Sequence, residues 1–121
     1  MKQIQINRAY ASLNKLLGMD LPARESRDIF MLARSLQDHY AFEADRERKL
    51  VQKYGGIIRD DGQIVFQDTE NLESFKQEVS EIGDLDVDID ITPVTINCDM
   101  LGDQRISPMD MMNLVDFVIF E

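Results

Sequence analysis

The chain has 121 residues, of which 44% are hydrophobic, and a formal net charge of −10 at pH 7. This length suits one domain with one hydrophobic core, so we expect residues 1–121 to form a single domain. The single cysteine, Cys98, excludes an intramolecular disulfide and a multi-cysteine zinc site, and no apolar run approaches the roughly 20 residues that cross a bilayer.

Charge is distributed unevenly along the chain. Residues 1–59 hold 11 Lys and Arg against 7 Asp and Glu, a net charge of +4, whereas residues 60–121 hold 2 against 16, a net charge of −14. A surface of that sign repels phosphate, so we expect no direct nucleic-acid binding and an attraction to a basic protein partner. No charged-then-apolar leader is visible, so we expect a cytoplasmic location.

The first 55 residues predict two helices. Ile4 and Ile6 alternate with glutamines, which indicates a short strand or extended arm. From Arg8 the apolar residues recur at helical spacing until Gly18, which predicts a first helix.

The second helix is expected to be long. Pro22 suits its first turn, with Asp20 or Leu21 as the cap, and an apolar stripe then continues to the Gly55-Gly56 stop, roughly 30 residues later. The two helices should pack as an antiparallel hairpin. Alternatively, the long helix could pair with itself in a homo-oligomer through Leu32, Leu36 and Tyr40.

The next segment predicts a β-hairpin followed by a helix. Asp61-Gly62 lies between Ile57-Ile58 and Ile64-Val65, and an Asp-Gly pair favours a tight primed turn. Asp68 or Thr69 then caps a helix whose apolar spacing continues to Gly83.

Strict alternation follows in residues 84–91, which predicts a half-buried strand with four aspartates on its outer face. Pro93 interrupts the ladder, and the apolar face continues beyond it, with Cys98 as a core residue. Ser107 as N-cap, Pro108 at the first helical position and Asp110, whose charge favours a helix N-terminus, predict a short C-terminal helix. Its apolar residues continue to Ile119. The fold class is therefore α+β: an N-terminal helical hairpin, a small, mostly antiparallel sheet and a C-terminal helix.

The aspartate ladder, Asp84, Asp86, Asp88 and Asp90, is the main candidate binding feature. A calcium loop would need a glycine where Ile89 stands and a closing acid where Thr95 stands, so we expect no metal site. We expect instead a solvated or partner-facing acidic surface.

Methionines form the second candidate feature. Met109 and Met111 are candidate partner contacts on the C-terminal helix, because methionine makes adaptable binding surfaces, whereas we expect Met112 in the core.

No catalytic or cofactor site is predicted. Any histidine-dependent mechanism would need His39, the only histidine, and a lone histidine in a charged helix is usually a surface residue. Gly55-Gly56 lacks the Lys-Ser/Thr of a phosphate loop. We therefore expect a protein that is not an enzyme and that binds no cofactor.

Several segments together resemble a group of small phage and prophage proteins of unknown function. The matching segments cover nearly the whole chain: Leu21-Pro22-Ala23-Arg24, Leu32-Ala33-Arg34-Ser35-Leu36, Lys53-Tyr54-Gly55, Asp60-Asp61-Gly62, the helix from Glu70 to Glu81, Val87-Asp88-Ile89, and Ile106-Ser107-Pro108-Met109-Asp110 with Leu114. The resemblance implies an accessory or assembly role in a bacterial host, with the protein in the cytoplasm or associated with the virion.

Two functional hypotheses follow. The first is a non-enzymatic interaction module in phage assembly that binds a basic partner. The second is an acidic inhibitor that mimics nucleic acid and occupies a host nuclease or polymerase, because regularly spaced carboxylates can replace phosphates electrostatically.

Overall fold

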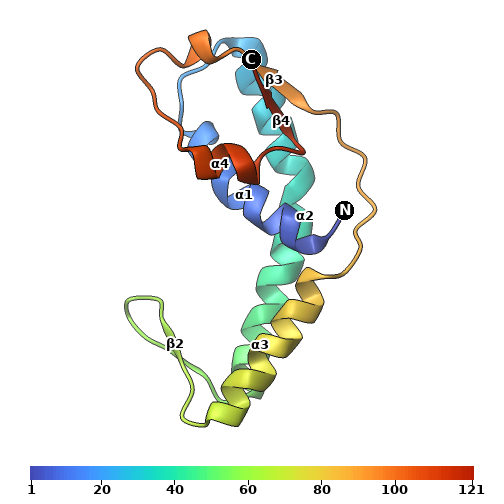
Figure 1. The fold of residues 1–121 in the computed structure, drawn as a ribbon, viewed down its shortest axis with the longest axis vertical. Helices are drawn as coiled ribbons and strands as arrows, with labels where there is room; N and C mark the ends of the chain where they lie inside the picture. The colour runs from blue at the N-terminus through green and yellow to red at the C-terminus, as the bar shows by residue number, and fades with distance from the viewer.

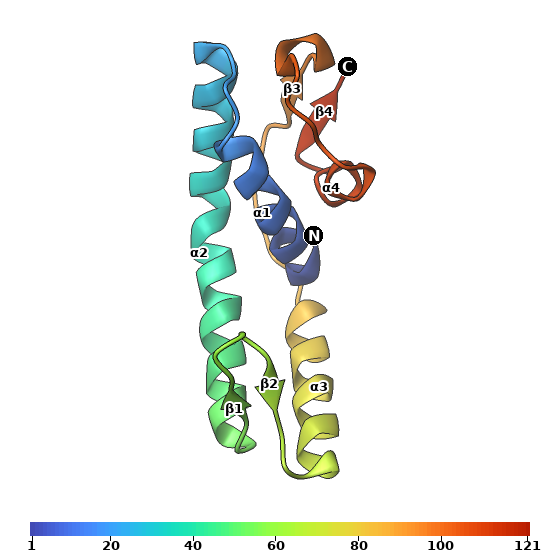
Figure 2. The same ribbon diagram turned by 90° about the vertical axis from the view of Figure 1, so that its left-hand side faces the viewer.

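The computed structural model describes residues 1–121 and confirms the α+β class. The long helix α2 runs nearly the full length of the molecule, and the other elements pack against one side of it (Figure 1, Figure 2). In chain order the elements are α1 (Gln3–Leu17), α2 (Ala23–Lys53), β1 (Ile57–Ile58), β2 (Ile64–Val65), α3 (Thr69–Gly83), β3 (Val94–Ile96), the 3-10 helix η1 (Cys98–Leu101), α4 (Pro108–Asn113) and β4 (Val118–Phe120).

Helix α1 begins five residues earlier than predicted, so the expected strand at Ile4 and Ile6 is wrong. Gln3 and Ile6 are both buried, and Gln3 extends the spacing of three or four residues that continues to Leu16. The side chain of Gln5 accepts a hydrogen bond from the backbone N–H of Lys2 at 2.8 Å, which satisfies a donor at the start of the helix. These contacts stabilise a helix, and the period-two spacing of Ile4 and Ile6 alone was too short to indicate a strand.

The predicted antiparallel packing of α1 on α2 is present (Figure 2). Helix α2 has 31 residues, close to the expected length, but Pro22 itself occupies the N-cap position expected for Asp20 or Leu21. Tyr10 stacks on Tyr40, with ring centroids 4.4 Å apart.

The residues proposed for self-pairing of α2 are already used within the chain. Leu32 and Leu36 are buried in the core between α2 and its neighbours. Tyr40 is partly exposed but stacks on α1. Self-association through these three side chains would therefore require opening the core, which corrects that expectation.

The β1–β2 hairpin forms as predicted but with a different turn. Ile57 pairs with Val65 and Ile58 with Ile64. Within the hairpin loop only Gly62 has a positive φ, of 86°. A primed turn of the Asp-Gly type needs positive φ at Asp61 as well, so Asp61-Gly62 does not form one. The N–H of Gly62 donates to the carbonyl of Arg59 at 2.9 Å, which makes a three-residue loop ending in a left-handed glycine.

Helix α3 begins and ends close to the predicted positions. Asp68 is its N-cap and accepts a hydrogen bond from the N–H of Glu70 at 2.8 Å. The helix lies antiparallel to the second half of α2, and its last turn reaches the first turn of α1, where Gly83 faces Ile4 (Figure 2). Helices α3 and α1 thus lie end to end along α2.

Residues 84–91 do not form the predicted strand. Asp84 keeps αR backbone angles at the end of α3, and the only ladder contact of the segment is an isolated antiparallel bridge between Asp86 and Lys2. The alternation is real, because Val87, Ile89 and Ile91 pack against the core while the aspartates are exposed. An extended chain can bury one face on helices as well as in a sheet, so alternation alone did not distinguish the two cases.

The C-terminal region differs most from expectation. Helix α4 starts as predicted, with Ser107 as N-cap, but ends at Asn113, and residues 118–120 form β4 instead of more helix. Strand β4 pairs in parallel with β3, with Val94 opposite Val118. The strands therefore form two separate two-stranded ladders, one antiparallel and one parallel. Cys98 is exposed at the start of η1, so its predicted core position is wrong.

The buried core lies almost entirely in one half of the molecule. Its 14 residues come from positions 6–36 and 94–118, whereas the only buried hydrophobic residues between them are Val51 and Phe75. The ring of Phe66, just after the hairpin, packs at a tilt against that of Phe75, with centroids 4.9 Å apart, and Lys53 pairs with Glu78 at 3.1 Å. Few buried contacts therefore hold α3 on the second half of α2.

We expect local opening to follow this division. Amides of residues 44–53 and 70–80 should exchange with solvent at least about tenfold faster than those of residues 9–16 and 29–36, a difference of roughly 1.4 kcal/mol in opening free energy. Native-state hydrogen exchange measures this directly. Equal protection of both halves would contradict it.

Candidate protein-binding surface

The four aspartates predicted to face outward do so. Asp84, Asp86, Asp88 and Asp90, here called the aspartate row, are all exposed. Asp84 is the C-cap of α3 and has αR backbone angles. Asp86, Asp88 and Asp90 follow it and alternate with the half-buried Val87, Ile89 and Ile91, so these three carboxylates face solvent on the outer side of the segment.

The first residues of the chain hold the row in place. The N–H of Gln3 donates to the carbonyl of Leu85 at 2.9 Å, and the N–H of Val87 donates to the carbonyl of Met1 at 2.7 Å. Lys2 pairs with Asp86 at 3.1 Å. Both partners are exposed, so this ion pair contributes little to stability and leaves the row strongly negative.

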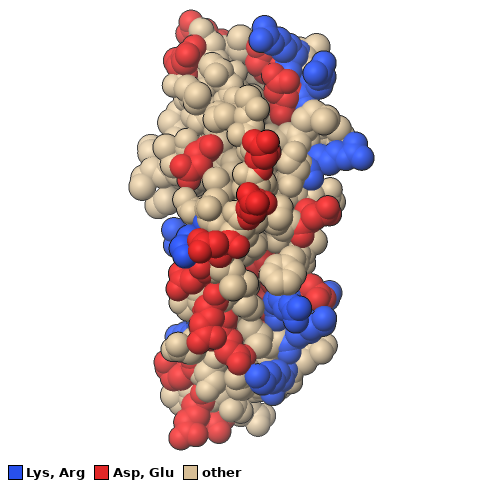
Figure 3. Space-filling model, turned by 90° about the vertical axis from the view of Figure 1, so that its right-hand side faces the viewer, with Lys and Arg blue, Asp and Glu red and all other residues tan.

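Acidic groups elsewhere in the second half also lie at the surface. Of the 16 acidic residues after position 59, 14 are exposed, Glu78 is half-buried and Asp110 is buried. Figure 3 shows a column of acidic side chains along one face, with Lys and Arg in separate clusters beside it. Acidic groups therefore predominate along this column, although Lys2 pairs with Asp86 and Lys53 with Glu78.

The solvent exposure of the C-terminal methionines agrees only in part with the prediction. Met109 is 62% exposed, as a contact residue should be, and Met111 is half-buried. Met112, expected in the core, is 68% exposed, and Val115 beyond it is 69% exposed. Helix α4 is too short to carry a complete apolar stripe, and Leu114 and Phe117, which follow it, supply the core contacts instead.

The residues considered for catalysis lie on different elements. His39 is half-buried in the middle of α2, and its backbone carbonyl accepts a hydrogen bond from Gln3 Nε2 at 2.8 Å. Cys98 lies at the start of η1. No group of three or more His, Cys, Asp or Glu side chains is placed to hold a metal ion.

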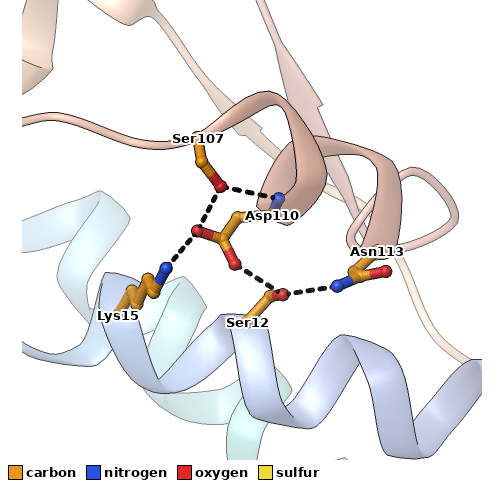
Figure 4. A network of polar contacts seen from close by, with 5 residues as sticks. All are labelled: Ser12, Lys15, Ser107, Asp110 and Asn113. Carbon is orange, nitrogen blue, oxygen red and sulfur yellow. Dashed lines mark hydrogen bonds and ion pairs between the residues drawn. The ribbon is translucent and has the colours of Figure 1, made fainter.

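One buried polar cluster was not predicted (Figure 4). Asp110 has a side chain only 8% exposed and accepts hydrogen bonds from Lys15 Nζ at 2.6 Å, Ser107 Oγ at 2.8 Å and Ser12 Oγ at 2.9 Å. Asn113 Nδ2 donates to Ser12 Oγ at 3.0 Å. The sequence indicated only that the charge of Asp110 favours the start of α4, because its partners on α1 are about a hundred residues away in the chain.

This cluster fastens α4 to α1. The hydrogen bonds from Lys15, Ser107 and Ser12 lower the pKa of Asp110 from 3.8 to about 2, although burial acts in the opposite direction. Ser12 is 3% exposed, so its hydroxyl has no access to a substrate. The cluster of Asp110 with Ser12, Lys15, Ser107 and Asn113, here called the Asp110 lock, therefore has a structural role.

Comparison with known proteins gives no relative: no family model, curated protein or solved structure matches the chain. None of the helices is both long enough and apolar enough to span a membrane.

Removing the central carboxylate should destabilise the fold. Asp110→Asn is expected to lower the free energy of unfolding at pH 7 by on the order of 2 kcal/mol, because three charge-assisted hydrogen bonds are weakened. Urea denaturation measures this change. Asp103→Asn, which removes an exposed charge, is the matched control and should stay within about 0.5 kcal/mol of wild type.

The pH dependence has a defined sign. The folded-state pKa of Asp110 lies below 3.8, so its contribution is fully present above that value and is lost as the pH falls toward about 2. The stability difference between wild type and Asp110→Asn should therefore be constant above pH 5 and shrink between about pH 4 and pH 2. A difference that grows on acidification would contradict this account.

Proposed function

We propose that this protein is a non-enzymatic interaction module that binds a basic protein partner through its acidic surface. The observation that carries the proposal is the aspartate row, which is exposed along its length and has one cationic partner, Lys2. Desolvating carboxylates is unfavourable unless opposite charges replace the water, so a binding face of this kind selects a basic counterpart.

The predominance of exposed acidic groups after position 59 supports electrostatic steering. A face of one sign raises the local concentration of oppositely charged partners and increases the association rate, and this effect weakens as salt is added. Met109 and Met111 add adaptable apolar contacts on α4.

The biological setting is part of the same proposal. The resemblance to small phage and prophage proteins supports an accessory or assembly role in a bacterial host, in the cytoplasm or on the virion. The basic partner would then be a virion or assembly protein.

Neutralising the row tests the proposal. Tagged wild-type protein, recovered from infected or lysogenic cells in mild salt, should retain a basic virion or assembly protein. The triple variant Asp84→Asn, Asp86→Asn, Asp88→Asn should lose at least about tenfold in affinity for that protein, measured with both components purified.

The control removes the same number of charges elsewhere. Asp60→Asn, Glu73→Gln and Asp103→Asn together neutralise three exposed carboxylates outside the row and should change the affinity less than about threefold. Recovery of no virion or assembly protein, or equal loss in both triple variants, would count against the proposal.

A second candidate function is inhibition of a host nuclease or polymerase by nucleic-acid mimicry. The repeated exposed carboxylates of Asp86, Asp88 and Asp90 are the observation that favours it, because such carboxylates can occupy a phosphate-binding channel. In that case the protein should compete with DNA for the enzyme, and binding should weaken steeply with salt. Binding to the enzyme with wild-type affinity after neutralisation of the row would remove this candidate.

A further inference from the structure

A hollow of about 310 Å³ lies between α1 and the first half of α2. Its lining is mostly apolar and consists of Tyr10, Leu17, Phe30, Ala33, Arg34 and Gln37. Phe30 is 54% exposed and Leu17 is 44% exposed, so the hollow is open to solvent. A volume at the low end of the range of ligand-binding pockets suits a few apolar side chains of a partner.

Two free arginines lie on the same side of α2 as the hollow. Arg34 lines it, and Arg27 lies seven residues earlier, which places both on one face of the helix. Neither takes part in any of the ion pairs within the chain. Glu25 and Asp28 face another way, because they line the pocket beside β3. Asp38, the next acidic residue along this face, is not part of the lining. The hollow therefore combines apolar walls with a basic rim.

The C-terminal segment carries the opposite combination. Met112 and Val115, here called the ridge, are 68% and 69% exposed, the largest exposed fractions among the large hydrophobic side chains. The N–H of Val115 donates to the carbonyl of Met112 at 3.3 Å, so one helical turn joins them and both side chains lie on the same side. Residues 106–121 contain Asp110, Asp116 and Glu121 but no Lys or Arg. The ridge is therefore apolar with acidic surroundings.

The ridge cannot reach the hollow of its own chain. Ser12 and Lys15 hold α4 on one side of α1 through the Asp110 lock. At about 3.6 residues per turn, Tyr10 and Leu17 lie on the opposite side of the same helix. Figure 2 shows α1 between α2 and α4, in agreement with this arrangement. A ridge can meet the hollow only when a second copy supplies it.

We propose that the hollow binds the ridge of a second copy of this chain, so that copies associate head to tail. The inference goes beyond the proposed function, because it uses neither the aspartate row nor Met109 and Met111. Hollow and ridge lie on opposite sides of α1, so each copy can contact two neighbours. Such a contact between unlike surfaces continues from copy to copy until a ring closes.

The contact has an apolar and an electrostatic component. Met112 fits an irregular apolar hollow because its side chain is unbranched and flexible, and it removes the exposed ring of Phe30 from water. Arg27 and Arg34 then face an acidic segment that includes the exposed Asp116. Both components are present in the same pair of surfaces, which favours a second copy as the occupant.

Two other occupants fit less well. A basic segment would bring its charges against Arg27 and Arg34, so the hollow and the aspartate row select different partners. A nucleic acid would be attracted by two arginines but repelled by the net charge of −10. An acidic helix of another protein is the remaining alternative, and the experiment below distinguishes it from a second copy.

Sedimentation velocity measures the self-association. In about 150 mM salt, which screens the repulsion between copies, wild type should shift from monomer toward larger species as its concentration rises to roughly 1 mM. A wild type that stays monomeric over this range would overturn the inference and leave the hollow to another protein.

Glutamine substitutions remove one surface at a time without adding charge. Leu17→Gln with Phe30→Gln makes the hollow variant, and Met112→Gln with Val115→Gln makes the ridge variant. All four side chains are exposed, so both variants should fold, which circular dichroism checks. Each variant alone should self-associate at least about tenfold more weakly than wild type.

Mixing the two variants is the decisive experiment. The hollow variant keeps its ridge and the ridge variant keeps its hollow, so an equimolar mixture should form heterodimers that grow no further. The control Ile57→Gln with Ile58→Gln changes side chains of similar exposure on the hairpin and should stay within about twofold of wild type. A mixture that forms no heterodimer, or a control that weakens as much as the variants, would overturn the pairing of hollow and ridge.

Charge is tested separately. Arg27→Gln with Arg34→Gln should weaken self-association at least about fivefold, whereas Arg24→Gln with Arg59→Gln, which removes two exposed arginines elsewhere, should change it less than about twofold. The two double variants have the same net charge, so a difference between them reports local contacts. Equal effects would contradict the basic rim as part of the binding site.

Discussion

The apolar stripe on the first half of α2 is the contact on which the rest of the structure depends. Ile29, Leu32 and Leu36 are buried against α1 and the C-terminal elements, and truncating one such leucine to alanine typically costs about 2–5 kcal/mol. The Asp110 lock adds a few hydrogen bonds to this packing and fixes where α4 sits on α1. Apolar burial therefore sets the stability, and the lock sets the orientation of the C-terminal segment.

This arrangement places several acidic side chains next to the aspartate row. The C-terminal segment supplies β4 to one edge of β3, and α2 packs along the other edge. Asp90, the last member of the row, lies with Glu25, Asp28 and Glu121 around a pocket between α2 and the segment that leads into β3. The negative surface that attracts a basic partner therefore extends beyond the row.

Local signals predicted the parts of the fold that local chemistry controls. Gly18, the Gly55-Gly56 stop, the Asp68 cap and the Ser107 cap marked helix ends correctly, and the exposure of the aspartate row followed from alternation. The predictions were wrong where contacts between residues far apart in the sequence determine the local structure.

Burial of Gln3 made the first residues helical, and pairing with β3 made residues 118–120 a strand. The Asp110 lock and the pocket between α2 and the segment before β3 could not be predicted, because each joins segments that only the tertiary fold brings together. The most direct test of the account is to record the amide chemical shifts by NMR with and without a saturating amount of a synthetic peptide of alternating lysine and valine. The account predicts that the largest shift changes fall on residues 84–90, because the aspartate row binds the basic side chains. Changes that spare these residues, or no binding of the peptide, would contradict the account.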